Sequence, residues 1–333
     1  MRRDKESFKM SPSFGDFATY GRFLSAANSN IGVGAFGDPC LHLSDDWSSL
    51  LRRIIPGGPF SALFASGRMM VPNGDFVTVG AYDAVNSANQ VQVTFYGGSG
   101  VISVSRGSTV LLTTAPGQFP LSAYFWCSIL FAVGAGAAGA VGVNIGSVNK
   151  VNLSGVNTQN TGRGYFDTVS YIGTGYLQHL LFDDTTGSYN NTYAPDQRVL
   201  GEFPNGAGAS TQFTPYGNAA NYLNAAASPP APATDNNTGA TVGLVDLYTV
   251  PGPSGVTSVS SVMISAIAAK TDSGARSLAT VLRSGGVTAS GVSVPLASSD
   301  TVQADVWEVD PSTSVPFIPS ALAALQVGAE VSA

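Results

Sequence analysis

The sequence predicts an all-β protein built from two β-sandwich domains. Short runs of alternating apolar and polar residues recur about every ten residues, as expected for the strands of a sandwich or jelly roll. Clusters of Gly, Pro, Asn and Ser separate these runs, and helical patterns between them are few. With 333 residues, 44% of them hydrophobic, the chain is long enough to bury two ordinary cores.

Charged residues make up only 11% of the chain, while Gly alone occurs 39 times. The surface must therefore consist largely of Gly, Ser, Thr and Asn, which lose little side-chain entropy when they are covered. Such a surface suits contacts with copies of the same chain or with other proteins. The net charge of −6 argues against binding to nucleic acid, because that requires a basic face.

Several strands can be placed directly from the alternation. Val91, Val93 and Phe95 alternate with polar residues before the turn at 97–100, and residues 101–105 and 109–113 form a hairpin. Residues 128–148 lack charges, but their five glycines favour two short strands and a turn over a membrane span, so no membrane insertion is expected. Further strands are predicted at 262–268 and 278–283.

Two helices are predicted. Ser44 can cap a helix over residues 45–53, whose acidic first turn and basic last turn suit the helix dipole. Ser320 can cap a second helix over residues 321–325. Residues 225–241 are rich in Pro, Ala and Asn and predict a long loop.

The domain organisation follows from these patterns. The first sandwich is expected over residues 39–202 and the second over residues 203–333. Residues 1–38 show no periodicity and are predicted to form an extended arm that docks on a neighbouring subunit. The alternative is that the arm adds edge strands to its own sandwich.

Each sequence motif that could indicate catalysis or cofactor binding also has a structural explanation. The glycine pattern of residues 134–139 matches G-x-G-x-x-G, but a strand pattern follows it rather than a helix, so we interpret it as a hairpin. His179 lies in an apolar strand, and His42 is the only other histidine, so no catalytic triad is expected. Cys40 and Cys127 are interpreted as buried free thiols, although their separation also allows one bridge. No metal-binding spacing and no cofactor site is predicted.

Paired carboxylates are the remaining catalytic pattern. Asp183 with Asp184, or Asp75 with Asp83, could form a glycosidase pair, but adjacent residues of a strand point to opposite faces. The segment 183–187 is better explained as a turn with bonds from Asp side chains to the backbone, with calcium binding there as an alternative. We name no catalytic residue. A solvent-facing aromatic platform that stacks on a sugar ring is the alternative to core packing for the aromatic residues.

Long segments resemble a known family. The segment GVNTQNTGRGYFDTVSYIGTG (155–175) and the segment 180–215 resemble virion proteins of tailed bacteriophages, in which a concanavalin A/laminin-G-like jelly roll precedes a second β-domain. The segments 269–286 and 306–331 are similar to that second domain. Residues 41–54 are similar to the entry strand and helix of the family. Gln178 and His179 replace an acidic pair found in relatives, and Phe317 stands where an indole is common.

The resemblance implies a non-enzymatic structural component of a virion, in the tail, baseplate or fibre apparatus. Its partners would be other virion proteins and copies of itself, as in a homo-oligomer such as a trimer. One alternative is a decoration protein of the capsid head. Another is a carbohydrate-binding module for receptor recognition, with a glycan of the host surface as its partner.

Overall fold

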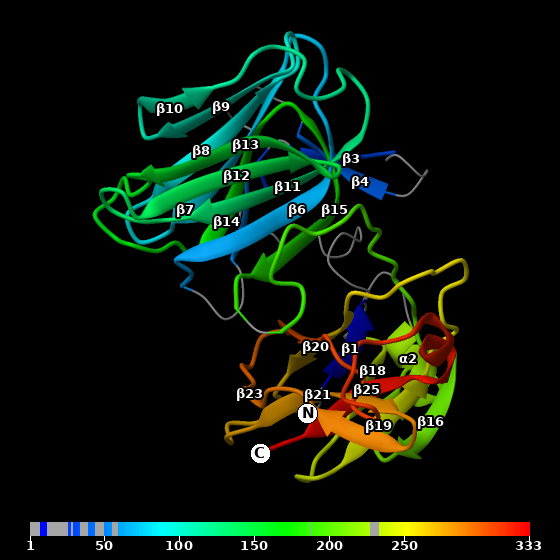
Figure 1. Ribbon diagram of the computed structural model, residues 1–333. Helices are drawn as coiled ribbons and strands as arrows, with labels where there is room; N and C mark the ends of the chain where they lie inside the picture. The colour runs from blue at the N-terminus through cyan, green and yellow to red at the C-terminus, as the bar shows by residue number, and fades with distance from the viewer. Residues whose placement is uncertain are drawn as a thin grey trace. The chain divides into compact units, whose positions relative to one another are not determined.

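The computed structural model describes residues 7–11, 26–27, 29–33, 39–43, 50–54, 59–186, 188–226 and 233–333 (Figure 1). Side chains are described for Leu43 and for the described residues from 59 onward. The chain divides into two compact units. We call residues 14–199 the first sandwich, and residues 1–13 together with 200–333 the second sandwich.

The first sandwich consists of two antiparallel seven-stranded sheets. One sheet has the order β10 (Thr109–Thr113), β9 (Val101–Arg106), β8 (Ala88–Tyr96), β7 (Phe76–Asp83), β14 (Thr168–Gly173), β5 (Leu50–Ile54) and β2 (Ala26–Ala27). The other has the order β13 (Val148–Val156), β12 (Gly139–Ile145), β11 (Phe125–Ala132), β6 (Ala62–Met70), β15 (Gly175–Asp184), β4 (Pro39–Leu43) and β3 (Ser29–Val33).

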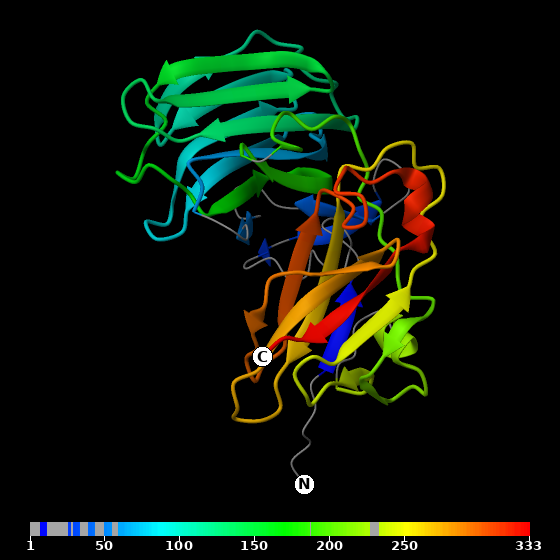
Figure 2. The same cartoon turned by 60° about the horizontal axis from the view of Figure 1, so that its bottom comes forward.

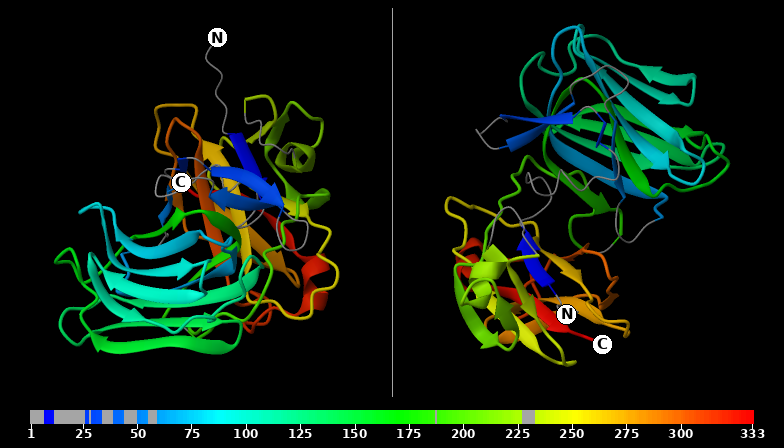
Figure 3. Two further views of the ribbon diagram at one scale, coloured as in Figure 1. Left: turned by 90° about the horizontal axis from the view of Figure 1, so that it is seen from above. Right: turned by 180° about the vertical axis from the view of Figure 1, so that it is seen from behind.

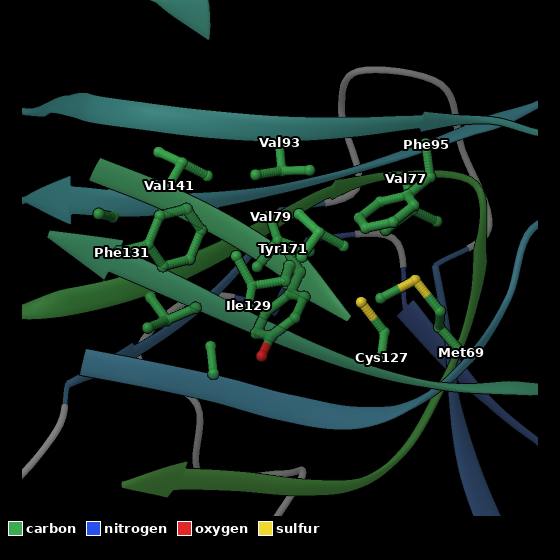
Figure 4. Packing of buried hydrophobic residues seen from close by; sticks show 14 of the residues in the cluster. Met69, Val77, Val79, Val93, Phe95, Cys127, Ile129, Phe131, Val141 and Tyr171 are labelled. Atoms are coloured by element: carbon green, nitrogen blue, oxygen red, sulfur yellow. The ribbon is translucent and has the colours of Figure 1, made fainter. Parts of the chain in front are cut away.

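The core of the first sandwich lies between the inner faces of these two sheets (Figure 4). Val77 and Val79 of β7 point inward because alternate residues of a strand face the same side. They meet Ile129 and Phe131 of β11, and burial of each such side chain stabilises the fold by about 2 kcal/mol. Cys127 is a buried free thiol, as predicted, and burial raises its pKa well above the usual range.

The second sandwich packs a three-stranded sheet against a larger one (Figure 2). The smaller sheet has the order β1 (Ser7–Ser11), β20 (Val262–Ala269), β24 (Thr301–Trp307). The larger sheet has the order β16 (Gly206–Thr211), β19 (Val245–Thr249), β25 (Gln326–Val331), β21 (Ser277–Ser284), β22 (Val287–Ser290), and β23 (Val294–Pro295) also pairs with β21. A separate ribbon joins β17 (Thr214–Tyr216) to β18 (Asn236–Thr238), and the helix α2 (Asn221–Ala226) packs against both strands. The 3₁₀ helix η1 (Pro319–Ala324) precedes β25.

The predicted all-β fold with two sandwiches is confirmed. The hairpin predicted over 101–113 is the pair β9–β10, and the uncharged stretch 128–148 forms β11 and β12, joined by a glycine-rich turn. The G-x-G-x-x-G pattern lies in that turn, where the Ala138 N–H donates to the Ala135 carbonyl at 3.1 Å. No helix among the described residues has the length and apolar character that a membrane crossing requires.

The predicted helix over 45–53 is wrong in its second half. Residues 50–54 form β5, which pairs along its length with β14, so sheet pairing overrides the local helix pattern. Residues 44–49 lie outside the described residues. The predicted C-terminal helix is present as η1, but its N-cap is Ile318, without a side-chain bond, and Pro319 rather than a capped Ser320 begins it. The loop expected at 225–241 contains the end of α2 and the strand β18.

The N-terminal segment contains strands that pair within the chain. β1 pairs antiparallel with β20 of the second sandwich, and its blue ribbon lies among the strands of that unit in Figure 3. β2 pairs with β5 and β3 pairs with β4, both in the first sandwich. These pairings favour the alternative in which the segment supplies edge strands. A role of residues 1–38 in assembly stays a prediction.

Candidate binding site on the loop end of the first sandwich

A polar cluster fixes the loop 157–167 to the turn between β7 and β8. Its centre is Asp83, the last residue of β7, whose side chain is fully buried. The backbone N–H groups of Val85 and Asn86 donate to its Oδ1 atom at 3.1 and 3.2 Å. The Asp83 carboxylate thereby closes the turn, as short acidic side chains do at strand ends.

Three side chains complete the shell of Asp83. Arg163 Nη1 lies 2.6 Å from Oδ1, while Thr161 Oγ1 and Asn86 Nδ2 donate to Oδ2 at 2.6 and 2.7 Å. Burial by itself raises the pKa of Asp83, but the hydrogen bonds from Thr161 and Asn86 and the charge of Arg163 outweigh it, so the pKa lies below its ordinary value. Asp83 is therefore a structural anion.

The fully buried side chain of Gln90, in β8, holds the loop 157–167 in place. Its Oε1 atom accepts the backbone N–H groups of Asn160 and Thr161 at 2.8 and 3.0 Å. Its Nε2 atom lies 2.8 and 3.0 Å from the carbonyl oxygens of Arg163 and Tyr165. One carboxamide thus fixes four backbone groups of the loop, two N–H groups and two carbonyl groups, and the loop needs no regular strand pairing to keep its shape.

Arg163 carries this cluster to the surface. Its guanidinium carbon lies 4.1 Å from the centre of the Tyr165 ring, a cation–π stack, and its side chain is 24% exposed. Asn86 and Asn160, which bond to Asp83 and Gln90, are also exposed. We call Asp83, Asn86, Gln90, Asn160, Thr161, Arg163 and Tyr165 the Arg163 platform. It offers a flat guanidinium of fixed orientation, backed by an aromatic ring and flanked by amide groups.

The outer face of the sheet that contains β6 and β11 is covered by residues 188–199, which we call the strap. Arg68 of β6 forms an ion pair with Asp196, in which its Nη2 atom lies 2.6 and 2.5 Å from the two carboxylate oxygens. Trp126 of β11 donates its indole N–H to the Ala194 carbonyl at 2.9 Å and is 2% exposed. The Trp126 ring is therefore buried under the strap.

The strap is fitted closely to its sheet. The Tyr193 ring packs edge-on against Phe64 at 5.1 Å, and burial raises the pKa of Tyr193. Its hydroxyl occupies the space that a Cβ atom at Gly142 would need, so this strand position requires glycine. The strap leaves this part of the sheet face closed to a ligand.

The residues discussed as catalytic candidates take structural places. His179 lies at a β-bulge of β15 with φ of 53°, and its Nδ1 atom accepts the Val199 N–H at 3.3 Å. Asp75 and Asp83 lie at opposite ends of β7, about 25 Å apart at 3.3 Å per residue, too far for a glycosidase pair. Asp183 and Asp184 end β15, and Asp184 accepts both the N–H and the hydroxyl of Thr186 at 2.8 Å, as predicted for bonds from Asp side chains to the backbone. Residue 187 of the predicted turn lies outside the described residues.

The acidic, cysteine and histidine side chains in the described part of the chain form no group of three or more that could hold a metal ion. The side chains of Cys40 and His42 lie outside the described residues.

A second buried cluster lies in the second sandwich, next to α2. Asp246 accepts hydrogen bonds from the backbone N–H groups of Gln212 and Phe213, and from the side chains of Asn221 and Tyr248. All of its partners point inward, and Asp246 and Tyr248 are at most 1% exposed. This cluster joins elements to one another and presents no group to a ligand.

The Arg163 platform was missed in the residue-by-residue sequence analysis. Asp83 and Arg163 are separated by 80 positions, and nothing in the local pattern of either segment links them. Two signals touched it separately: Asp83 was considered as half of a carboxylate pair, and the loop lies within the segment 155–175 that carries the family resemblance.

No family model matches the sequence, and no curated protein matches it either. Solved structures show weak likenesses. Sheep galectin-11 in complex with glycerol is 8% identical, with 40% of this chain and 95% of that one covered and a TM-score of 0.28. The carbohydrate-binding module CBM66 from Bacillus subtilis is 5% identical, with 48% and 94% covered and a TM-score of 0.33. A protein of unknown function with a galectin-like fold from Bacillus subtilis is 7% identical, with 55% and 98% covered and a TM-score of 0.37.

Proposed function

We propose that the chain is a non-catalytic binding protein whose first sandwich recognises a carbohydrate through the Arg163 platform. The observation that carries the proposal is the geometry of Arg163, which stacks on Tyr165 while it is paired with the buried Asp83. The guanidinium is thereby oriented before any ligand arrives, and a group that is already ordered loses little entropy on binding.

The chemistry of the platform suits a sugar. A guanidinium has five N–H donors in one plane, so Arg163 keeps donors for hydroxyl groups after pairing with Asp83. Asn86 and Asn160 add amide donors and acceptors at the rim. The partly exposed Tyr165 ring offers an apolar edge to the C–H groups of a sugar ring. The strap covers the outer face of β6 and β11 and closes it to a ligand. The Arg163 platform, on the loop 157–167 and the turn between β7 and β8, remains accessible.

The test is a glycan array followed by calorimetry on the best-bound glycan, using the full chain. We expect Arg163→Ala to weaken binding about tenfold, because it removes the donors and the stacked cation together. The matched control is Arg276→Ala, since Arg276 pairs with Asp272 at 2.7 Å on the second sandwich. Binding should be unchanged in that control. Absence of binding to every glycan, or equal affinity of the Arg163→Ala variant, would refute the proposal.

A second candidate is a structural role in a bacteriophage virion, in the tail, baseplate or fibre apparatus or as a head decoration. It is supported by the family resemblance of the segments 155–175, 269–286 and 306–331, and by the low charge of the surface. The two candidates are compatible, because a virion component can also bind a host glycan. Mass spectrometry and antibody labelling of purified particles would test it, and a chain missing from the particles would contradict it.

A further inference from the structure

β24 is an edge strand with an open side. It pairs with β20 over seven consecutive residues, from Thr301 with Ala268 to Trp307 with Val262, without a register shift. In the order of the smaller sheet it is the last strand, as Figure 2 shows for the second sandwich. Within the described residues, the backbone of β24 hydrogen-bonds to β20 alone. Its outer edge is therefore a row of N–H and C=O groups that no strand of the described part of the chain pairs with.

This edge lacks the usual protection against strand pairing. Proteins commonly block an open edge with lysine, proline or a bulge, and β24 has none of these. Its single charge, Asp305, is held inside by the Thr280 hydroxyl at 2.6 Å and the Val292 N–H at 3.1 Å. Val302 and Val306 are instead 45% and 54% exposed on the outer face.

The strand is also complementary to itself. Antiparallel pairing of two copies about Ala304 would place Val302 of each copy opposite Val306 of the other, on one face. Gln303 would face Asp305 on the other face, an amide opposite a carboxylate rather than two like charges. Directly opposed residues with matching character are the unit by which sheet pairing is stabilised.

We propose that β24 pairs antiparallel with β24 of a second copy of this chain across a two-fold axis at Ala304. The smaller sheets of the two copies then form one six-stranded sheet with β24 at its centre. The contact is isologous, so it closes on itself and yields a dimer rather than a filament. This inference does not rest on carbohydrate binding. A dimer would carry two Arg163 platforms and could gain avidity for a repeated glycan.

The test compares two double variants of the full chain by light scattering and sedimentation over a wide range of concentration. Val302→Lys with Val306→Lys places lysine opposite lysine at both ends of the interface, and should raise the dimer dissociation constant at least about tenfold. Val302→Lys with Val306→Glu changes the same exposed positions but places opposite charges face to face, and should retain the dimer. Circular dichroism checks that both variants remain folded.

A cross-link locates the axis. Paired residues of antiparallel strands have Cα atoms about 4.5 to 5.5 Å apart, which is within the range of a disulfide. Ala304→Cys should therefore form a covalent dimer rapidly on mild oxidation. Val315→Cys, at a residue of the same unit that is 52% exposed, should not. A monomer at all concentrations, a dimer that survives the double lysine change, or equal cross-linking of the two cysteine variants would overturn the proposal. The open edge would then be available to a strand of a different protein.

Discussion

Asp83 in the first sandwich and Asp246 in the second are both completely buried, but different kinds of donor surround them. Asp83 is paired with a cation, Arg163, whose side chain remains 24% exposed. Asp246 receives only neutral donors, namely two backbone N–H groups, the Asn221 amide and the Tyr248 hydroxyl. The Asp83 cluster therefore reaches the surface through Arg163, whereas the Asp246 cluster has no charged partner at the surface within the described residues.

The closed cluster extends through amide groups. Asn237 Nδ2 donates to the Tyr248 hydroxyl at 2.9 Å and to the Asn221 carbonyl, while Asn224 bonds Asn237 in turn. Burial, and next the charge of Asp246, raise the pKa of Tyr248 well above its usual range. The comparison indicates that a buried carboxylate alone does not mark a binding site. What distinguishes the Arg163 platform is the charged partner at the surface.

The largest loss of stability is expected for Asp246→Ala. The change leaves four donors without their acceptor, three of them in buried bonds, and each lost partner costs part of a hydrogen bond. We expect the second sandwich to lose about 4 kcal/mol, with the first sandwich unaffected. Denaturant unfolding followed by hydrogen exchange with mass spectrometry measures each unit. Equal protection of residues 245–249 in both proteins would contradict the assignment.

A smaller effect is expected for Asp83→Asn. Asparagine keeps one acceptor for the turn, and Arg163 can turn to water because it is already partly exposed. The first sandwich should lose about 2 kcal/mol, less than the value for breaking a wholly buried pair. The same variant should weaken glycan binding, because the guanidinium loses its fixed orientation. If Asp83→Asn lost as much unfolding free energy as Asp246→Ala, the partial exposure of Arg163 would not reduce the cost of breaking the pair.

The sequence predicted what depends on local pattern. Alternation identified β8, the hairpin β9–β10, and the strands β20 and β21. It failed where distant pairing decides the structure, since residues 50–54 have helix signals but pair with β14. The short helix α2 was missed because its buried face consists of Asn221, Asn224 and Ala225, which give no hydrophobic pattern. Hydrogen bonds of the two asparagine side chains hold the helix in place. The Arg163 platform joins β7, β8 and a loop that are distant in the sequence.

Acid should affect the two sandwiches through different carboxyl groups. The folded-state pKa of Asp83 lies below its ordinary value, because hydrogen bonds and Arg163 outweigh the effect of burial. A carboxyl with a lowered pKa stabilises the fold above its unfolded pKa of about 4, and this contribution is lost as the pH falls through the lower, folded value. The stability of the first sandwich should therefore decline on acidification below about pH 5, and Asp83→Asn should flatten that decline.

The second sandwich provides the contrast for this measurement. Asp310 also has a lowered pKa, because bonds from Ser312 and Ser284 outweigh burial, whereas burial raises the pKa of Glu202. Glu202, whose pKa is raised, favours the folded state at low pH. Asp310, whose pKa is lowered, favours the folded state at higher pH, so the two contributions to stability oppose each other. Asp83→Asn should leave the pH profile of this unit unchanged, while Asp310→Asn should remove its acid-sensitive part. Hydrogen exchange measured on both units from pH 6 downward would reveal the difference. If Asp83→Asn left the acid response of the first sandwich intact, Asp83 would not be the group that titrates.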